Sequence, residues 1–201
     1  MQMWDERYSK DEYVFGKEPN TFLVSAASQI PRGRVLCIGE GEGRNAVYLA
    51  SLGYEVVAVD QSASGMAKAA RLAAERGVPL QTMVRDLAHW QIDPNAWQGI
   101  VSIFCHLPAA LRQQVHRNVV TGLATNGVFV LEAYTPRQLT FQTGGPRDPN
   151  MLPTPALLQD ELAGLDFAVL QEMERSVVEG LYHTGMAAVV QVVARKPGRT
   201  I

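Results

Sequence analysis

Short runs of apolar residues recur along the chain, separated by longer segments in which apolar positions have helical spacing. A continuous run of four or five apolar residues is typical of a strand buried on both faces of a parallel sheet. We predict strands of such a sheet at residues 35–38, 55–59, 80–84, 100–104 and 128–131. Two further strands, at residues 167–177 and 186–195, follow one another through a short link and predict an antiparallel hairpin at the sheet edge.

Capping residues mark the helices between these strands. Asn20 or Thr21 can cap a helix that stops before Pro31, and Ser62 can cap a helix that ends near Gly77. Further helices are predicted around residues 46–53, from residue 108 to 120, and near residues 155–164, with a turn at residues 126–127. The N-terminal twenty residues are predicted to form an arm with a short helix.

Strands that alternate with helices predict an α/β fold. We expect a Rossmann-like, doubly wound, mostly parallel sheet of seven strands with a C-terminal antiparallel hairpin. Residues 1–201 are predicted to form one domain, made of an arm and helix (residues 1–30) and a core (residues 34–196). Residues 135–155 form a long loop with five prolines, and its Gly144-Gly145-Pro146 segment is a candidate lid over an acceptor.

A glycine-rich segment lies between the first of these strands and the helix that follows it. Its sequence is Gly39-Glu40-Gly41-Glu42-Gly43. Glycine permits sharp turns and close approach of a ligand, and ligands of open α/β sheets bind at the carboxyl ends of the strands. Asp60 ends the second strand about 20 residues later, the spacing at which a carboxylate accepts hydrogen bonds from ribose hydroxyls. The two features together predict a site for a ligand that contains adenosine.

The charge of this segment favours S-adenosylmethionine over a dinucleotide. Gly41, Gly43 and Ala46 satisfy the relaxed dinucleotide fingerprint. However, Glu40 and Glu42 would lie beside the two negative charges of a pyrophosphate. S-adenosylmethionine instead brings a positive sulfonium and a positive ammonium, to which an acidic loop is complementary. An NAD-dependent oxidoreductase is therefore the weaker alternative.

The same residues carry a family resemblance. Residues 35–46 resemble the first motif of class I S-adenosylmethionine-dependent methyltransferases, and residues 57–62 resemble their acidic second motif. Residues 103–108 resemble the fourth-strand motif, and the likeness extends over most of the chain. The resemblance implies S-adenosylmethionine as the cofactor and methyl transfer as the activity. The cofactor-binding residues that it implies are Gly39, Glu40, Gly41, Gly43, Asp60, Gln61, Asp86, Leu87 and Phe104.

The N-terminal arm resembles one group within that family. Residues 4–8, Phe15-Gly16 and Pro19-Asn20 are similar to the start of the tellurite-resistance and thiopurine methyltransferases. In that group aromatic residues of the arm close over the cofactor, so the resemblance implies this role for Trp4, Tyr8 and Phe15. The alternative is that these side chains only pack the arm onto the sheet.

The chain departs from the family pattern at two positions. The family often has an acid where this chain has Cys37, and a small residue or cysteine where it has Glu40. Glu40 is therefore either a partner of the cofactor's ammonium group or a residue that faces solvent.

Methyl transfer from a sulfonium is an in-line displacement in which positioning supplies much of the acceleration. A general base is required only where the acceptor must lose a proton. His106, after the fourth strand, is the candidate base, with a structural role as the alternative, and Tyr134 is the candidate for the acceptor pocket. Tyr182 and His183, in the link of the last hairpin, either reach the same mouth or are ordinary exposed residues. The spacing of histidines and cysteines predicts no metal site.

Composition limits the classes of partner. The 201 residues are 47% hydrophobic and 19% charged, with a net charge of −2, so a basic surface for nucleic acid is not expected. No apolar run approaches the ~18 residues that span a bilayer. We expect a cytoplasmic monomer or homodimer that acts on a small-molecule acceptor without contacting membrane or nucleic acid. A regulatory module that binds S-adenosylmethionine without catalysis is the alternative of a different class.

Overall fold

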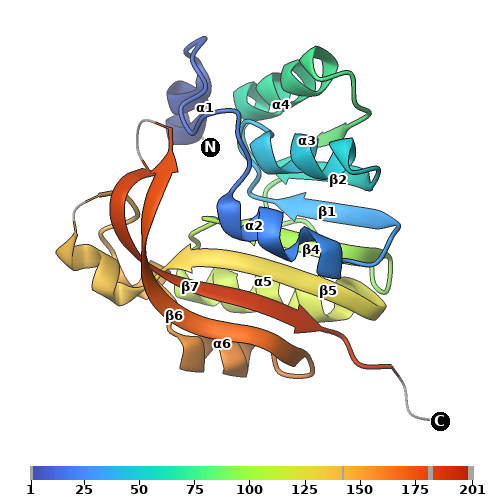
Figure 1. Cartoon of the computed structure of the whole chain (residues 1–201), viewed down its shortest axis with the longest axis vertical. Coiled ribbons are helices and arrows are strands. Elements are labelled where there is room, and N and C mark those ends of the chain that lie inside the picture. The colour runs from blue at the N-terminus through green and yellow to red at the C-terminus, as the bar shows by residue number, and fades with distance from the viewer. Residues whose placement is uncertain (1, 142, 181–182, 199–201) are drawn as a thin grey trace.

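The computed structural model describes residues 2–141, 143–180 and 183–198. Its strands form a single seven-stranded sheet in the order β3-β2-β1-β4-β5-β7-β6 (Figure 1). The strands are β1 (Arg34–Ile38), β2 (Glu55–Asp60), β3 (Gln81–Val84), β4 (Trp97–Ile103), β5 (Leu123–Tyr134), β6 (Asp166–Glu179) and β7 (His183–Arg195). The first five are parallel, and β7 runs antiparallel to both β5 and β6. The predicted fold class, including the C-terminal hairpin, is confirmed.

Helices cover both faces of the sheet. The α-helices are α1 (Gln2–Tyr8), α2 (Thr21–Ala26), α3 (Arg44–Ser51), α4 (Ala63–Glu75), α5 (Ala109–Gly122) and α6 (Pro155–Glu161). Val35 and Cys37 of β1 pack with α2, α3 and α4, whereas Leu36 and Ile38 pack with α5 and α6. Alternate residues of one strand thus enter two different cores, which explains why its sequence is apolar throughout. No helix in the described part of the chain has the length and apolar character needed to cross a bilayer.

The predicted caps form where the sequence placed them. The Asn20 side chain accepts a hydrogen bond from the backbone N–H of Leu23 at the start of α2. The Ser62 hydroxyl accepts one from the N–H of Gly65 at the start of α4. Each cap satisfies a backbone donor that has no partner within its helix.

The fifth strand differs from the prediction. The sequence predicts a turn at residues 126–127, but β5 begins at Leu123 and continues through both residues. Asn126 adopts a positive φ of 64°, and the register between β4 and β5 shifts at this place. The turn residues therefore form an irregularity within a longer strand, where asparagine tolerates the left-handed conformation.

The long loop also contains local structure. Short 3-10 helices, η2 (Pro136–Thr140) and η3 (Pro149–Met151), lie between β5 and α6, and a third, η1 (Ala27–Gln29), follows α2. The Gln138 side chain fastens the loop to the sheet, because its Oε1 accepts from the N–H of Ala188 and its Nε2 donates to Thr143.

Candidate active site

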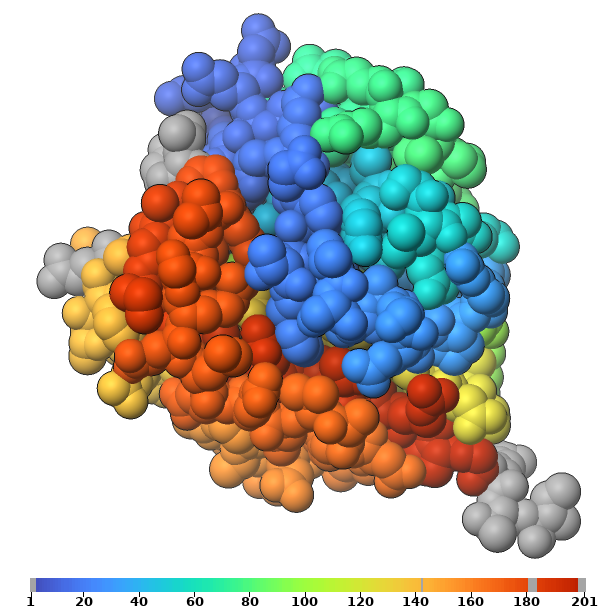
Figure 2. Space-filling model, in the orientation of Figure 1, coloured from blue at the N-terminus to red at the C-terminus, as the bar shows by residue number. Residues whose placement is uncertain are grey.

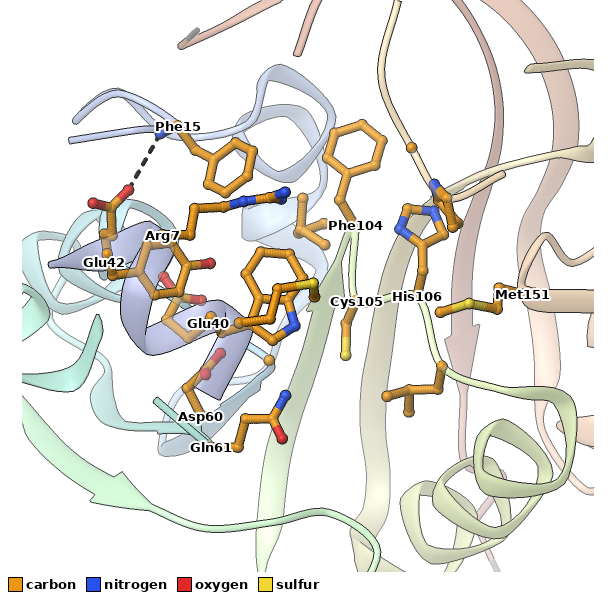
Figure 3. Close-up of a pocket in the computed structure, with 18 of the residues that line it drawn as sticks. Arg7, Phe15, Glu40, Glu42, Asp60, Gln61, Phe104, Cys105, His106 and Met151 are labelled. Carbon is orange, nitrogen blue, oxygen red and sulfur yellow. Dashed lines mark hydrogen bonds between the residues drawn. The ribbon is translucent and has the colours of Figure 1, made fainter. Parts of the chain in front are cut away.

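A cavity of about 990 Å³ opens at the carboxyl ends of the parallel strands. It lies where the strand order reverses between β1 and β4, the usual ligand position in doubly wound sheets. The N-terminal segment covers this region, and Figure 2 shows it between the β6–β7 hairpin and helices α3 and α4. Figure 3 shows two sides of the cavity, with Glu40, Glu42, Asp60 and Gln61 on one and Phe104, Cys105, His106 and Met151 on the other.

The loop after β1 requires glycine for steric reasons. Gly39 has a φ of 60°, and a Cβ there would lie 2.4 Å from the Cys105 sulfur. Gly41 has a φ of 65°, and a Cβ there would lie 2.7 Å from the Tyr8 hydroxyl. Only glycine permits both the left-handed backbone and these close approaches. Gly39 lines the cavity, whereas Gly41 lies under the arm.

The third glycine of the loop has a different position. Gly43 is the N-cap of α3, with a φ of 94°. A Cβ at Gly43 would lie 2.6 Å from the Cα of Ala69, so this glycine allows α3 to pack closely on α4. Gly41 and Gly43 do not belong to the cavity lining, and they shape the loop that presents Gly39 and Glu40.

Asp60 holds the glycine loop in place from the end of β2. Its Oδ2 accepts from the N–H of Gly41 and its Oδ1 from the N–H of Ser62, both at 2.9 Å. Burial raises the pKa of this carboxyl, and the backbone donors act in the opposite direction. A carboxylate oxygen accepts more than one hydrogen bond, so both oxygens retain capacity for ribose hydroxyls. Asp60 lines the cavity.

Glu40 also lines the cavity, and it is only partly exposed. Its Oε1 accepts from the N–H groups of Asn45 and Ala46, at 3.0 and 2.8 Å, at the start of α3. Burial raises the pKa of this carboxyl to about 7, and the negative charge of Asp60 adds to the effect. The two backbone donors and the Arg44 guanidinium partly offset that rise.

The arm docks over the cavity through specific contacts. The Asp5 carboxylate accepts from the Ser62 hydroxyl at 2.6 Å and from the N–H of Ser64 at 3.2 Å. The rings of Trp4 and Tyr8 stack with centroids 5.6 Å apart. These two rings line the cavity, so the arm does more than pack on the sheet.

A second contact anchors the arm farther along the chain. The N–H of Phe15 donates to Glu42 at 3.2 Å (Figure 3). Glu42 pairs with Lys68 at 2.7 Å, with both charged side chains buried. Phe15 lines the cavity. At the β6–β7 hairpin, a Cβ on Gly180 would lie 2.4 Å from the carbonyl oxygen of Val14, so arm and hairpin are in direct contact.

Three predicted residues lie along the cavity after β2 and β3. Gln61, Asp86 and Leu87 all belong to its lining. The Asp86 carboxylate accepts from the N–H of Ala88 at 2.9 Å, and this hydrogen bond lowers the pKa of Asp86. Asp86 is therefore an ionised acceptor at neutral pH, suited to a donor group of a ligand.

An aromatic cluster forms the opposite side of the cavity. Phe104 lies at the end of β4 with a φ of 53°, an uncommon conformation for a bulky residue that turns the chain into the cavity. Its ring lies 4.6 Å from that of Tyr134, and the His106 ring stacks on Tyr134 at 5.3 Å with an interplanar angle of 8°. Phe104 and His106 line the cavity, while Tyr134 is fully buried behind them and outside its lining.

The remaining lining on this side is mostly apolar. It comprises Leu107, Pro108, Leu111, Thr143, Gly144, Gly145, Pro146, Met151 and Thr184. The predicted lid segment thus borders the cavity. Tyr182 lies outside the described residues, as does the side chain of His183.

The sequence pattern did not predict a buried ionic network beside the site. The Asn20 amide donates to Glu132 at 2.6 Å and to Glu179 at 2.9 Å. Arg175 pairs with both carboxylates, and Arg44 pairs with Glu179 at 2.5 Å. The network joins the arm, α3, β5 and the final hairpin. Glu132, a charged residue within the apolar run of β5, is a sequence feature from which a buried charge with a partner could have been predicted.

Comparisons with known proteins agree with this geometry. A model of the methyltransferase domain family matches residues 35–127. A probable S-adenosyl-L-methionine-dependent methyltransferase, TehB of Haemophilus influenzae, is 32% identical over 93 residues, covering 44% of this chain and 32% of TehB. A protein-L-isoaspartate O-methyltransferase of Chlorobaculum tepidum is 31% identical over 103 residues, covering 51% of this chain and 46% of that protein. The match thus spans 32% of the length of the first relative and 46% of that of the second.

Solved structures share the fold. The TehB structure aligns with 96% of this chain and 65% of its own, with a TM-score of 0.71 and 20% identity. A structure from work on the conversion of a disulfide bond into a thioacetal group during echinomycin biosynthesis aligns with 99% of this chain and 92% of its own, with a TM-score of 0.80 and 16% identity. Residues 35–127 thus match the methyltransferase domain family, and by this match and its fold the chain is similar to class I S-adenosylmethionine-dependent methyltransferases such as TehB, a family whose cofactor is S-adenosylmethionine.

Proposed function

We propose that this chain transfers the methyl group of S-adenosylmethionine to a small-molecule acceptor. The observation that carries the proposal is one continuous cavity with an acidic side and an aromatic side. Its volume of about 990 Å³ is at the upper end of the ~300–1,000 Å³ typical of ligand pockets, which favours room for both cofactor and acceptor.

The acidic side suits the cofactor. Asp60 has two oriented oxygens for the ribose hydroxyls. Asp86 and Leu87, which by resemblance match the adenine contact of the family, line the same cavity. Glu40 belongs to the glycine loop at which the methionine end of the cofactor would lie, and its carboxylate accepts from N–H groups at the start of α3. When bound, the cofactor supplies a methyl group activated by a positive sulfonium.

The aromatic side suits a small, largely apolar acceptor. Phe104, His106, Leu111 and Met151 give it flat and apolar surfaces. Within the described lining, the carboxylates are those of Glu40, Glu42, Asp60 and Asp86, all on the cofactor side. The acceptor side therefore positions its ligand without a carboxylate base. This arrangement favours acceptors whose nucleophilic atom carries an available lone pair at neutral pH.

The covering of the site favours a small molecule over a macromolecule. The arm, the loop at residues 143–146 and the hairpin all border the cavity. Such a cover limits the size of the acceptor and excludes water, which strengthens electrostatic interactions around the sulfonium.

Transfer of labelled methyl groups to a panel of small acceptors tests this function. The panel should contain thiols, amines, phenols and soft inorganic anions, with the Asp60→Asn variant as the control. Label should appear on at least one small acceptor with the wild-type protein and be strongly reduced with the variant. Tight binding of cofactor with no transfer to any small molecule would instead favour a regulatory module or a macromolecular acceptor.

A further inference from the structure

Glu40, in the glycine loop of residues 39–43, is an acidic residue at a position where the resembled family often has an uncharged one. The resembled family often carries an acid at the position of Cys37 and a small residue at that of Glu40, and this chain has the reverse. The Cys37 thiol is fully buried, and burial raises its pKa well above its ordinary value, so position 37 supplies no charge. The acidic group of this chain instead lies on the wall of the cavity, at Glu40.

The Glu40 carboxylate is oriented on one oxygen only. Oε1 accepts two backbone N–H groups at the start of α3, which fixes the direction of the side chain. Within the described residues, no hydrogen bond involves Oε2. A fixed carboxylate with one oxygen uncommitted, on the wall of a cavity, is a binding group for a cation with N–H donors.

The charged side chains next to Glu40 have partners of their own, so Glu40 is the carboxylate with an oxygen available for such a cation. Arg44 on α3 pairs with Glu179, and Glu42 in the loop pairs with Lys68. Asp60 at the end of β2 accepts from the N–H groups of Gly41 and Ser62, and the proposed function assigns the remaining capacity of its two oxygens to the ribose hydroxyls.

We propose that Glu40 is the counter-charge of the cofactor's α-ammonium group and that it releases a proton when the cofactor binds. This inference rests on the proposed function, since it concerns the same cavity. With its pKa at about 7, Glu40 is about half protonated at neutral pH before binding. An adjacent cation favours the ionised form of a carboxyl, so binding lowers this pKa and expels the proton.

The direction of the pH dependence follows. Between pH 6 and 8 the ionised fraction of a group with this pKa rises about tenfold, so affinity for the cofactor rises about tenfold over that interval. Other titratable groups packed around the loop are the Asp60 carboxyl, the Tyr8 hydroxyl and the Cys37 and Cys105 thiols, and burial raises the pKa of each of them. The further charged side chains of the cavity lining are Arg7, Glu42, Arg44, Arg85 and Asp86. The Cys105 thiol, with its pKa raised to about 12, stays protonated throughout that interval.

Titration calorimetry with S-adenosylhomocysteine tests the proposal on the wild-type protein and on Glu40→Gln. Glutamine keeps an oxygen for the N–H groups of Asn45 and Ala46 but carries no charge. Methylthioadenosine, which has the same nucleoside and lacks the amino acid, is the control ligand. Glu55→Gln, on an exposed side chain of β2, is the control variant. Measurement in two buffers of different ionisation enthalpy gives the number of protons released.

The wild-type protein should release about half a proton per S-adenosylhomocysteine at pH 7 and bind about tenfold tighter at pH 8 than at pH 6. Glu40→Gln should weaken binding at pH 8 by about ten- to a hundredfold, with little pH dependence and unchanged affinity for methylthioadenosine. Equal affinity of both proteins for S-adenosylhomocysteine, or equal proton release, would overturn the proposal while leaving the cofactor assignment intact. Failure of the wild-type protein to bind either ligand would instead contradict the proposed function.

Discussion

The backbone N–H of Tyr134 donates a hydrogen bond to Nε2 of His106 at 3.0 Å. An imidazole nitrogen that accepts a hydrogen bond carries no proton, so the ring is neutral with its proton on Nδ1. In this tautomer His106 has no second lone pair with which to remove a proton from an acceptor. The geometry thus favours a positioning role for His106 over the base role that its sequence position suggests.

His106→Gln should therefore retain more than about a tenth of the wild-type kcat, because the glutamine oxygen can accept from the N–H of Tyr134. Its kcat/KM profile between pH 6 and 8 should match that of the wild-type protein. Steady-state kinetics with an acceptor from the panel measures both. Removal of a general base costs about 10²–10⁴-fold and abolishes one limb of the profile, and that result would restore the base role.

Asp60→Asn should weaken binding of S-adenosylhomocysteine by about 1.5–3 kcal/mol, the scale of hydrogen bonds to a charged group. The amide has one acceptor oxygen where the carboxylate has two, so the N–H groups of Gly41 and Ser62 and the ribose hydroxyls compete for it. Titration calorimetry gives the affinity, and circular dichroism confirms folding. Unchanged affinity in a folded variant would remove Asp60 from the cofactor site.

The buried ionic network around Asn20 predicts that a nearly isosteric substitution of this residue strongly lowers the stability of the protein. Asn20→Asp should lower the free energy of unfolding at pH 8 by on the order of 2–4 kcal/mol. The new carboxylate would face Glu132 and Glu179, which now accept from the Asn20 amide. Aspartate caps helices as well as asparagine does, so loss of the α2 cap does not explain such a change. Urea unfolding measures it.

The sign of the pH effect distinguishes this repulsion from lost packing. Two neighbouring carboxylates raise the pKa of an aspartate at position 20 in the folded state. The destabilisation should therefore shrink as the pH falls from 8 to 5 and the added charge is neutralised. Asn20→Ser keeps a capping oxygen and adds no charge, so its effect should be the same at both pH values relative to the wild-type protein. A pH-independent loss in Asn20→Asp would argue against the network as described.

Glu40 should also make the stability of the ligand-free protein depend on pH, and this stability should fall as the pH rises. Its folded-state pKa of about 7 lies above its ordinary value of 4.5, so the folded chain binds this proton more tightly than the unfolded chain does. The stability that the protonated group contributes is lost as the pH rises through that interval. Between pH 5 and pH 8, Glu40→Gln should gain on the order of 1–3 kcal/mol relative to the wild-type protein without ligand. Urea unfolding curves that change in parallel for both proteins would contradict this expectation.

The sequence predicted the elements whose signals are local. The glycines of the loop, Asp60 at a strand end and the capping residue Ser62 depend on neighbours within a few positions, and each lies where it was expected. The alternation of apolar strands and helices likewise determined the sheet, because strands such as β1 are buried on both faces.

The pattern of apolar and polar residues could not predict contacts between segments that are distant in the sequence. The bond between Asn20 and Glu132 joins residues 112 positions apart, and no local period reports it. The burial of Tyr134 behind Phe104 and His106 depends on the positive φ of Phe104 and on the packing of the loop, which the sequence does not reveal. The irregularity at Asn126 was mistaken for a turn because the same residue type favours both.

The most direct test of the cofactor assignment is thermal unfolding with S-adenosylmethionine, S-adenosylhomocysteine and NAD in parallel. A ligand at a hundred times its dissociation constant stabilises a protein by ~2.7 kcal/mol. At ~2–4 °C per kcal/mol for a chain of this size, the Tm should rise by roughly 5–11 °C with each of the first two ligands and stay constant with NAD. A rise with NAD alone would contradict the cofactor site described for Asp60 and the acidic loop.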